Sequence, residues 1–290
     1  MSKKIGFIGQ GWIGRNYAND FENRGFEVVR HALEEPYIKN GEHIPECDIV
    51  FIAVPTPTTV EGFDDSILRS AIKKVGPGMI AVIKSTVLPG TTEAIQADNP
   101  GILVLHSPEF LRETSAAHDA AHPNRNIIGV PVDNETYRQA AQTVLSVLPK
   151  APYELVCSAR EAELVKYMGN CFLYQKVVFV NMLYDLAASL GCKWETVAEA
   201  FAADPRIGGS HLKPVHASGH VDEDKGGRGA GGHCLIKDYA ALTDLYRKHV
   251  GDEAGLAALD ALKDKNIDLL VKSGKDLDLL KGVYGEELIK

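Results

Sequence analysis

The stretch IGFIGQGWIG, residues 5–14, decides the fold of the first half of this chain. A short apolar segment is followed at once by three glycines in the arrangement GxGxxG, at the start of an amphipathic stretch. One glycine permits a tight turn, one lets a pyrophosphate approach the backbone, and one lets helix and strand pack closely. The helix N-terminus then faces the phosphates. The motif predicts a dinucleotide site at Gly9, Gly11, Trp12, Ile13 and Gly14.

Apolar strands alternate with helical stretches from residue 4 to about residue 158. The predicted strands cover residues 5–9, 26–32, 48–55, 79–85, 102–107, 126–131 and 153–156. The predicted helices between them include residues 13–24, 66–74 and 135–148. Alternation of this kind is typical of an α/β fold with a doubly wound parallel sheet.

The strand signals stop after Ser158. Ser158 and Glu161 have the spacing of a capping box, which predicts a long helix to about residue 190. Helical stretches follow at 194–203 and from 238 to the end, with a glycine-rich loop at 208–232 between them. The sequence therefore predicts a dinucleotide-binding domain over residues 1–156. An all-α domain over residues 157–290, entered by the long helix, is expected to follow.

Composition excludes several classes of function. The net charge is −8 and no basic stripe is present, so a nucleic-acid partner is not expected. The N-terminus has no signal-peptide pattern and no run of 18 apolar residues occurs, which predicts no membrane partner and a cytoplasmic location. Five scattered cysteines without a CxxC pair indicate neither a disulfide framework nor a metal site.

The end of the second predicted strand leaves the cofactor open between NAD and NADP. An acid usually binds the adenosine ribose there, but this strand ends Arg30-His31-Ala32. Glu34 and Glu35 follow slightly late and are candidates for that role. Arg30 is a candidate for a 2′-phosphate, and a solvated arginine is the alternative. The sequence favours NAD and does not exclude NADP.

Four polar segments carry the residue types of a chemical site. KSTVLPGTT (84–92) and SPEFLRE (107–113) follow the fourth and fifth predicted strands, where ligands bind in open α/β sheets. Lys166 and Asn170 are four residues apart on the long helix and share one face. The segment GAGGHCLIKD (229–238) contains Cys234.

These segments, together with DPRIG at 204–208, resemble in their order and spelling the UDP-glucose/GDP-mannose 6-dehydrogenase family over nearly the whole chain. The resemblance implies oxidation of a primary alcohol to a carboxylate with two nicotinamide cofactors in turn. An aldehyde does not readily give a second hydride until a nucleophile adds to it. The resemblance makes Cys234 that nucleophile, forming a thiohemiacetal that is oxidised to a thioester and then hydrolysed.

The resemblance also implies roles for the other residues. Lys166 and Asn170 would stabilise the oxyanion, with Lys166 also a candidate base. Three residues would position the hydrolytic water: Glu109, Thr86 and Asp238. Glu113 and Lys237 would lie near the nicotinamide end of the cofactor, and Thr86 would also bind the cofactor. Four would contact the small-molecule substrate: Phe110, Leu111, Arg206 and Gly231.

Each of these residues has a structural alternative. A lone cysteine is usually a small buried hydrophobe, and a lysine and asparagine at helical spacing are usually a solvated face. His233 is a candidate for shaping the loop only. The remaining cysteines are expected to be packing residues: Cys47, Cys157, Cys171 and Cys192.

Two departures from the family pattern affect the expected substrate. The connection at 33–46 is short, and the sequence stops at Lys290, about where a second α/β domain that grips the nucleotide begins in the family. We therefore expect the chemistry without tight capture of a uridine diphosphate. The loop at 208–232 is a candidate for part of the cover. Its charged run favours a less anionic substrate, or is simply solvated: Asp222, Glu223, Asp224 and Lys225.

Two other functions compete with this interpretation. A β-hydroxyacid dehydrogenase shares the architecture and the helix lysine and asparagine, but makes one hydride transfer and needs no cysteine. An inactive dinucleotide-binding module would reduce no cofactor. The long helix is apolar on several sides and predicts a homodimer. Its apolar positions are Leu164, Val165, Met168, Phe172, Val177, Val178, Phe179, Leu183 and Leu186. In the family, the counterpart of Arg206 reaches the partner's site.

Overall fold

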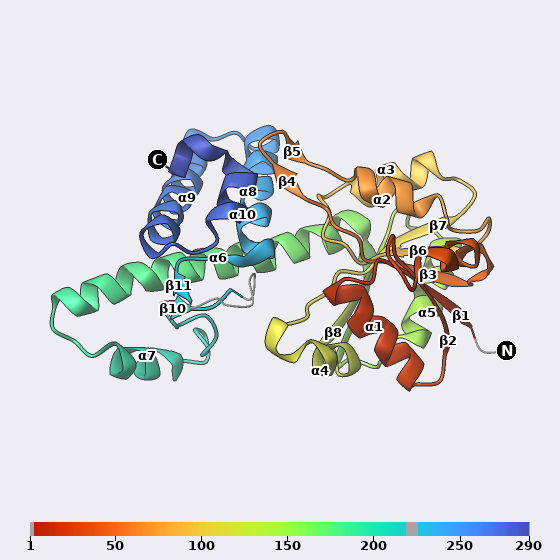
Figure 1. The fold of residues 1–290 in the computed structure, drawn as a ribbon, viewed down its shortest axis with the longest axis horizontal. Helices are drawn as coiled ribbons and strands as arrows, with labels where there is room; N and C mark the ends of the chain where they lie inside the picture. The colour runs from red at the N-terminus through yellow and green to blue at the C-terminus, as the bar shows by residue number, and fades with distance from the viewer. Residues whose placement is uncertain (1–2, 219–225, 290) are drawn as a thin grey trace. The chain divides into compact units, whose positions relative to one another are not determined.

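A computed structural model describes residues 3–218 and 226–289, and the chain divides into two compact units. The first unit contains Met1–Pro57 and Asp64–Lys166, and the second contains Thr58–Phe63 and Tyr167–Lys290. The division falls within the long helix α6 (Ala159–Ser189), drawn in green in Figure 1. The domain boundary between residues 156 and 157 stays a prediction.

The first unit is built on a seven-stranded sheet (Figure 1). Its strands, in the order β2-β1-β3-β6-β7-β8-β9, are the seven that the sequence predicts, so the doubly wound α/β fold is confirmed. In chain order they are β1 (Lys4–Ile8), β2 (Glu27–His31), β3 (Ile49–Ile52), β6 (Ile80–Ile83), β7 (Leu103–His106), β8 (Arg125–Val130) and β9 (Tyr153–Ser158).

One pairing departs from the predicted parallel sheet. Strand β8 runs antiparallel to β7 through the pair His106 and Gly129, whereas β9 is parallel to β8. The connection before β8 contains the short turn η3 (Glu113–Ser115) and only a six-residue helix, α4 (Ala116–Ala121). Such a helix is about 9 Å long, shorter than a strand, and does not carry the chain back to the opposite edge as a parallel crossover must. The sheet is therefore mixed.

Helices cover both faces of this sheet. Phe7 of β1 and Phe51 of β3 stack with ring centroids 5.1 Å apart, and Phe21 of α1 (Trp12–Asn23) packs against both. Helices α4 and α5 (Glu135–Val147) contribute to the same core. Because side chains alternate along a strand, Ile52 and Ile83 point to the other face. There α2 (Ser66–Ile72) contacts β3 and α3 (Thr91–Asp98) contacts β7.

Side-chain caps mark the starts of helices α6 and α3. Ser158 and Glu161 form the predicted capping box, in which the Ser158 N–H donates to Glu161 at 2.8 Å. Glu163 of α6 is fully buried and accepts from the backbone N–H of Gly90 at 2.6 Å and of Thr92 at 2.8 Å. It also accepts from Thr92 Oγ1 at 2.6 Å. This carboxylate caps α3 and fixes the end of the segment 84–92.

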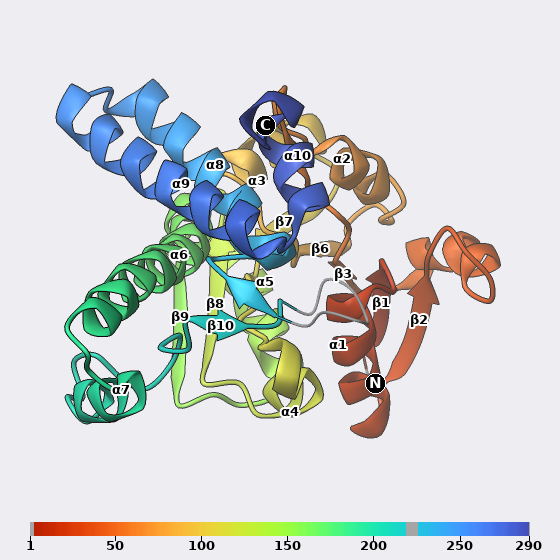
Figure 2. The ribbon, with the colours of Figure 1, turned by 60° about the vertical axis from the view of Figure 1, so that its left-hand side comes forward.

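The second unit is helical, as predicted. It contains most of α6, α7 (Trp194–Ala202), α8 (Gly232–His249), α9 (Glu253–Ser273), α10 (Leu277–Tyr284) and the turn η4 (Glu286–Ile289). Figure 2 shows α8 and α9 side by side, and Tyr174 of α6 stacks on Tyr239 of α8 at 3.9 Å between centroids. Two small hairpins were not predicted: β4 (Thr58–Thr59) with β5 (Gly62–Phe63), and β10 (Val215–His216) with β11 (Gly227–Arg228).

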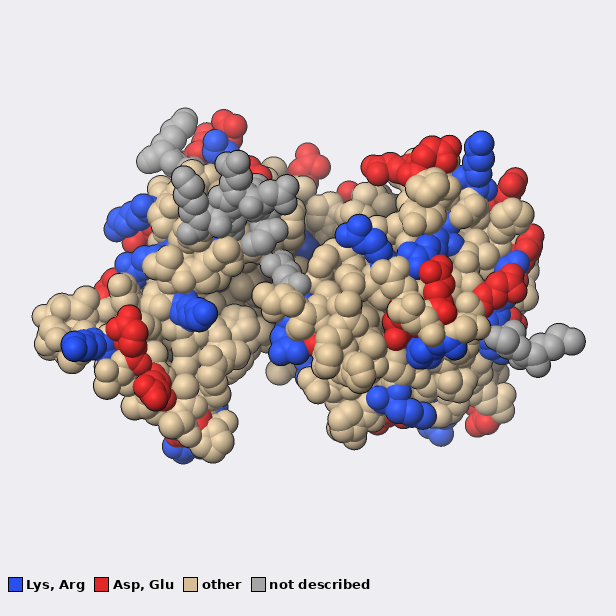
Figure 3. Space-filling view, turned by 60° about the horizontal axis from the view of Figure 1, so that its bottom comes forward, with Lys and Arg blue, Asp and Glu red and all other residues tan. Residues whose placement is uncertain are grey.

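Surface charge is mixed. On the face drawn in Figure 3, basic and acidic side chains alternate over the surface. In the part of the chain that the structure describes, every helix is too short or too polar to cross a membrane. Across residues 3–218 and 226–289, His, Cys, Asp and Glu side chains form no group of three that would hold a metal ion.

The short connection 33–46 folds as two 3₁₀ turns, η1 (Ile38–Glu42) and η2 (Ile44–Glu46).

Removing the Glu163 cap should destabilise the first unit. In Glu163→Ala, three donors lose their acceptor, the two of Thr92 being buried, and the expected loss is about 2–4 kcal/mol of unfolding free energy. Glu199→Ala, at an exposed position of α7, is the control and should change stability little. Urea unfolding followed by circular dichroism measures both. Equal midpoints for the two variants would show that Glu163 is not a structural cap.

Candidate active site

The predicted dinucleotide turn has the backbone that its glycines require. Gly9 has φ +93°, and a Cβ there would overlap the carbonyl oxygen of Ala53. A Cβ at Gly14 would overlap the carbonyl oxygen of Gly9, so helix α1 packs closely on β1 only because residue 14 is glycine. Gly11 has nothing within 4 Å of its Cβ position. Two glycines thus serve packing, and the third leaves open space at the N-terminus of α1, as a pyrophosphate needs.

The end of β2 differs from both sequence interpretations of Arg30. Arg30 is buried and donates to both carboxylate oxygens of Glu22, at 2.8 and 2.6 Å, and to Asn19 at 2.7 Å. Its charge is balanced inside the protein, because a buried guanidinium must be paired. It is therefore neither a solvated arginine nor an unpaired cation that awaits a 2′-phosphate. Glu34 and Glu35 are exposed just beyond the strand.

Two predicted catalytic residues of the first unit form a buried ion pair. Lys166 Nζ lies 2.7 Å from Glu109 Oε1, and the two side chains are 7% and 4% exposed. Glu109 Oε2 accepts the backbone N–H of Leu111 at 2.7 Å. The ring of Phe110 lies near the pair, with its centroid 5.8 Å from Lys166 Nζ. Because both charges are out of water, removal of one partner would leave the other uncompensated.

A second buried lysine lies at the same edge of the sheet. Lys84 Nζ donates to Ser107 Oγ at 3.1 Å and lies 4.3 Å from the centroid of the Tyr17 ring. The pKa of Lys84 is lowered to about 7, chiefly by burial; Glu109 opposes the shift, and Lys166 contributes to it to a smaller extent. Burial also lowers the pKa of His106 to about 3, so this histidine is neutral.

The remaining predicted residues of the first unit occupy the loops beside this edge. Trp12 and Ile13 begin α1 and are half-buried. Thr86 is half-buried, and its carbonyl accepts from Thr56 Oγ1 at 2.7 Å. Glu113 begins η3, and its side chain is not among those that the structure describes.

In the second unit, Cys234 lies in the first turn of helix α8 and is exposed. This corrects the expectation that its segment is a loop, because α8 begins at Gly232. The helix begins earlier than predicted because buried side chains supply acceptors for the backbone N–H groups ahead of it. A helix N-terminus favours negative charge, which suits a thiolate.

Those buried side chains come from α9 and the residues that follow it. Asp276 is buried and accepts the N–H of Gly232 at 2.7 Å and the hydroxyl of Ser218 at 2.8 Å. Asn266 accepts the N–H of Ala230 at 2.7 Å and donates to its carbonyl at 2.9 Å. A Cβ on Gly231 would overlap Asp276 Oδ2, so the predicted substrate residue Gly231 has a packing reason to be glycine.

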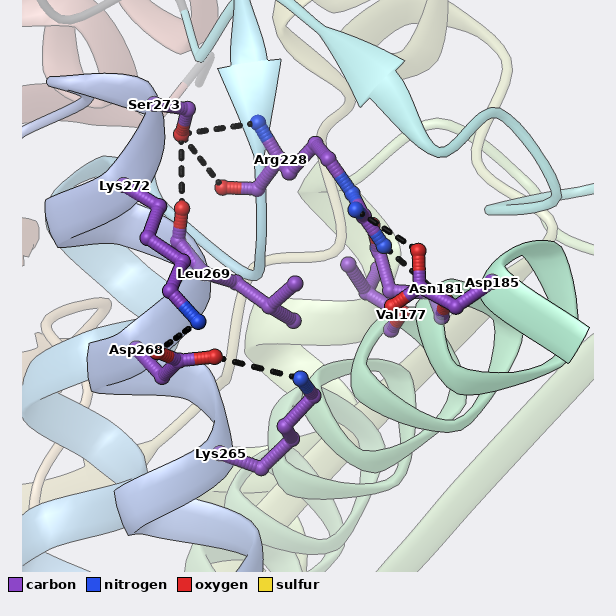
Figure 4. Close-up of polar contacts among 9 residues, drawn as sticks. All are labelled: Val177, Asn181, Asp185, Arg228, Lys265, Asp268, Leu269, Lys272 and Ser273. Carbon is purple, nitrogen blue, oxygen red and sulfur yellow. Dashed lines mark hydrogen bonds and ion pairs between the residues drawn. The ribbon is translucent and has the colours of Figure 1, made fainter. Parts of the chain in front are cut away.

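Arg228 anchors the other end of this segment (Figure 4). Its guanidinium donates to Asn181 Oδ1 at 2.8 Å and pairs with Asp185 at 2.8 Å, both on α6. Its backbone N–H donates to Ser273 Oγ at 3.0 Å, and that hydroxyl donates to the carbonyl of Leu269 on α9 at 2.8 Å. In the same view, Asp268 of α9 lies between Lys265 and Lys272. The glycine-rich segment before Cys234 is therefore held from two helices.

Three other predicted residues meet on α6 and α8. Asn170 Nδ2 donates to Asp238 Oδ2 at 2.6 Å, and Lys237 Nζ donates to Asp238 Oδ1 at 2.6 Å. Asp238 is fully buried, so both of its carboxylate oxygens are used inside the protein. The alternative of a solvated helix face is wrong for Asn170.

Several expectations are only partly met. The Arg206 side chain is 87% exposed and pairs with Asp204 at 2.6 Å. Cys47 and Cys171 are buried as expected and Cys157 is half-buried, but Cys192 is exposed because it follows the end of α6. The charged run lies outside the described residues: Asp222, Glu223, Asp224 and Lys225.

Sequence reasoning missed the residues that hold this chemistry in place. Asp276, Asn266 and Glu163 carry no local motif, and each is far along the chain from the segment that it holds. Lys84 lies within a motif that the sequence analysis singled out, but no role followed from its position there.

The doubly wound sheet and its glycine cradle define a dinucleotide-binding protein of the dehydrogenase fold class. The chain belongs to the UDP-glucose/GDP-mannose dehydrogenase family. Residues 37–146 match that family's NAD-binding domain and residues 160–266 match its central domain. The first half of the chain is therefore an NAD-binding domain. Its glycine fingerprint at 9–14 precedes the matched range.

Individual relatives agree with this membership. The chain is 31% identical over 242 residues to the UDP-glucose 6-dehydrogenase of Rickettsia prowazekii, a match that covers 79% of this chain and 53% of that protein. The chain thus spans about half the length of the curated relatives it matches. It resembles the UDP-glucose dehydrogenase structure of Pyrobaculum islandicum with TM-score 0.76 and 27% identity, over 94% of this chain and 70% of that one.

The fold alone is shared more widely. A Mycobacterium tuberculosis 3-hydroxyisobutyrate dehydrogenase structure matches with TM-score 0.68 and 16% identity, over 98% of this chain and 99% of that chain.

Loss of the Asp276 carboxylate should loosen the turn that carries Cys234. In Asp276→Ala, the N–H of Gly232 loses its acceptor, and its hydrogen exchange should accelerate tenfold or more, a loss of about 1.4 kcal/mol in local opening free energy. Gly231→Ala should act alike because the added Cβ displaces the same carboxylate. Asp264→Ala, at an exposed position of α9, is the control.

Hydrogen exchange followed by mass spectrometry over residues 226–238 distinguishes these variants. Unchanged protection of this segment in Asp276→Ala would contradict the assignment of Asp276 as its anchor.

Proposed function

We propose that this chain catalyses NAD-dependent oxidation of a primary alcohol, on a sugar-like or nucleotide-sugar-like substrate, to a carboxylate. Cys234 is the nucleophile of the second oxidation. Family membership supports the reaction class. Because the chain spans about half the length of its curated relatives, the activity and the substrate are our proposal for this chain.

The observation that carries the proposal is the exposed Cys234 on the first turn of α8. The backbone just before it is held by two buried side chains, Asp276 and Asn266, so the thiol is presented from a rigid support. A cysteine that served only packing would be buried. Thiol exposure on an immobilised turn at a helix N-terminus is the arrangement that a nucleophile needs.

The proposed reaction balances with groups on the chain, NAD and water. The alcohol loses a hydride and a proton to give an aldehyde, and the Cys234 thiolate adds to its carbonyl carbon. The resulting thiohemiacetal loses a second hydride and gives a thioester. Water then cleaves the carbon–sulfur bond, releasing the carboxylate and the thiol. One alcohol therefore yields two reduced cofactors and one acid.

We assign Lys166 to proton transfer and to stabilisation of negative charge, and its partner Glu109 to positioning. Lys166 Nζ accepts the alcohol proton in the first step, and as an ammonium it stabilises the oxyanion of the thiohemiacetal. Glu109 at 2.7 Å holds Lys166 in place and is assigned, with Thr86 and Asp238, to orient the hydrolytic water. Asn170, oriented by Asp238 at 2.6 Å, is a second oxyanion donor.

The cradle in the first unit fits NAD, which accepts the two hydrides when bound. Gly9, Gly11 and Gly14 have the backbone and open space that a pyrophosphate needs. The pairing of Arg30 with Glu22 favours NAD over NADP, because no unpaired cation is left on that side chain for a 2′-phosphate. Glu113 and Lys237 are assigned to the nicotinamide end.

A single-step β-hydroxyacid dehydrogenase is the alternative, supported by the likeness of fold and by the lysine and asparagine of α6. The cofactor count separates the two reactions. A screen of sugar nucleotides and small alcohols, with NADH measured by absorbance and acid by chromatography, should find two NADH for each acid formed. One NADH for each substrate would support the alternative, and no reduction with any alcohol would contradict the proposal.

Cys234→Ala should lose oxidation to the acid by roughly 10⁴-fold or more, as removal of other covalent nucleophiles does. NAD affinity should hardly change, because the glycine cradle lies elsewhere in the chain. Cys192→Ala, a second exposed cysteine, is the matched control and should keep its activity. Turnover to acid within tenfold of the parent in Cys234→Ala would rule out the covalent route.

We also propose that the chain forms a homodimer through α6. One side of this helix packs in the core, including Tyr174, Val177 and Val178. A second side carries large apolar residues that are 46–66% exposed: Met168, Phe172, Phe179, Met182 and Leu186. Their spacing repeats every three, four or seven residues, so they form one stripe. An exposed apolar stripe of this length marks an interaction surface, and a second copy of the same helix covers it.

Introducing a charge into the stripe should dissociate the dimer. Phe172→Glu and Phe179→Glu place carboxylates in a surface that must leave water on association, so the affinity of the dimer should fall by roughly 100-fold or more. Val250→Glu, also apolar and exposed but outside α6, is the control. Sedimentation velocity at micromolar concentration measures the state. An active monomer of the parent chain under these conditions would overturn the dimer.

A further inference from the structure

The first unit contains a pocket of about 380 Å³. Two of its lining residues, Phe110 and Leu111, are predicted substrate contacts, and the reaction proposed above gives no role to the buried Lys84 and Ser107 beside them. It lies at the carboxyl ends of β6 and β7 and the start of β8. Its walls come from α1, α4 and the segments after β7, and its lining includes Tyr17, Lys84, Ser107, Phe110, Leu111 and Arg125. None of the cradle glycines lines it.

Lys84 lies at the pocket with most of its hydrogen-bonding capacity unused. It is 3% exposed, and its ammonium donates one hydrogen bond, to Ser107 Oγ at 3.1 Å, among the described residues. An ammonium has three donors, and burying it without a counter-ion costs free energy. The Tyr17 ring at 4.3 Å compensates only part of this. Glu109 is committed to Lys166 and Leu111.

Arg125 adds a second positive charge without a counter-ion. Its guanidinium lies 3.7 Å from the centroid of the Phe110 ring, and no hydrogen bond or ion pair joins it to any residue of 3–218 or 226–289. Arg112, which also lines the pocket, differs because Asp119 neutralises it at 2.6 Å. The pocket therefore holds two basic side chains, one deep and one near the surface, and neither forms an ion pair with a carboxylate in the part of the chain that the structure describes.

The rest of the lining sets the size and shape of a ligand. Tyr17, Phe110, Leu111, Pro108 and Pro123 are apolar or aromatic, so they suit a flat apolar body. One buried ammonium matches one negative charge, because a second charge would be desolvated without a buried partner. We propose that this pocket binds a small organic monocarboxylate, with its carboxylate at Lys84 and Ser107 and its body against Phe110 and Tyr17.

The charges around the pocket predict that binding of a carboxylate takes up a proton. Burial lowers the pKa of Lys84 to about 7, against the opposing effect of Glu109 and with a smaller contribution from Lys166, so near pH 8 the empty pocket holds mostly neutral lysine. A carboxylate favours the ammonium and raises that pKa, so binding should take up a proton. Other titratable or charged groups near the pocket are His106, Glu109, Asp119, His122, Arg112, Arg125, Lys166 and Tyr17. The pKa values of His106 and Tyr17 are shifted so that both stay neutral near pH 8.

Calorimetric titration with benzoate tests the proposal directly. Near pH 8, in Tris and in HEPES, benzoate should bind with a dissociation constant on the order of 1 mM, as suits a ligand of this size. The apparent enthalpy should differ between the buffers by up to one proton taken up. Benzamide, its neutral isostere, should bind at least about tenfold more weakly, since it lacks the charge. The titrations are made with and without saturating NAD, so that they do not depend on the oxidation proposed above.

Three variants assign the effect to the pocket. Lys84→Met removes the buried charge at similar volume and should abolish proton uptake and weaken benzoate binding about tenfold or more, with benzamide unchanged. Arg125→Gln, at an exposed position, should weaken benzoate binding about threefold and keep proton uptake. Lys74→Met, an exposed lysine after α2, controls for the loss of one surface charge and should bind as the parent does.

Each outcome of these titrations either supports or overturns the proposed site. Benzoate binding that takes up a proton and needs Lys84 would support the site. Inorganic phosphate bound more tightly than benzoate, equal binding of benzoate and benzamide, or unchanged binding in Lys84→Met and Arg125→Gln would each overturn it. If Lys84→Met does not fold, the Arg125→Gln result and the buffer dependence of the parent still decide.

Discussion

Buried side-chain acceptors on backbone N–H groups fix the segments that contain the proposed catalytic residues of this chain. Glu163 accepts hydrogen bonds from the backbone N–H groups of Gly90 and Thr92, and Asp276 accepts one from the N–H of Gly232. Asn266 accepts a hydrogen bond from the N–H of Ala230 in the same way. These segments leave strands and enter helices, where backbone donors have no partner of their own. A buried donor without an acceptor is costly, so each of these contacts both stabilises the fold and selects one loop conformation.

The same constraint determines how charge is distributed beneath the sheet edge. Lys166 and Glu109 are desolvated together at 2.7 Å, and each makes the burial of the other tolerable. Lys84 forms no ion pair with a carboxylate among the described residues, and burial lowers its pKa to about 7. Two buried lysines at one edge thus differ in their partners: Lys166 has a carboxylate at 2.7 Å, whereas Lys84 has a serine hydroxyl at 3.1 Å.

The sequence predicts what is local and leaves open what is distant. The seven strands follow from apolar runs between turn residues, and the capping box at Ser158 and Glu161 follows from spacing over one helical turn. The reversed direction of β8 was not predicted, because strand patterns carry no direction. Cys234 was expected in a loop because glycines precede it, whereas Asp276, far along the chain, supplies the acceptor that lets the helix begin there. No window of sequence contains that contact.

The glycines illustrate how one residue type serves separate purposes that only the structure distinguishes. Gly9 is required by its positive φ, and Gly14 by the approach of helix to strand. Residue 231 must be glycine because a Cβ there would overlap the Asp276 side chain. None of these reasons applies to Gly11, because the space at its Cβ position is open. A glycine without an internal packing reason, at a helix N-terminus, is explained by an external ligand that must approach the backbone. Among the three glycines of the fingerprint, Gly11 is therefore the most direct evidence for dinucleotide binding.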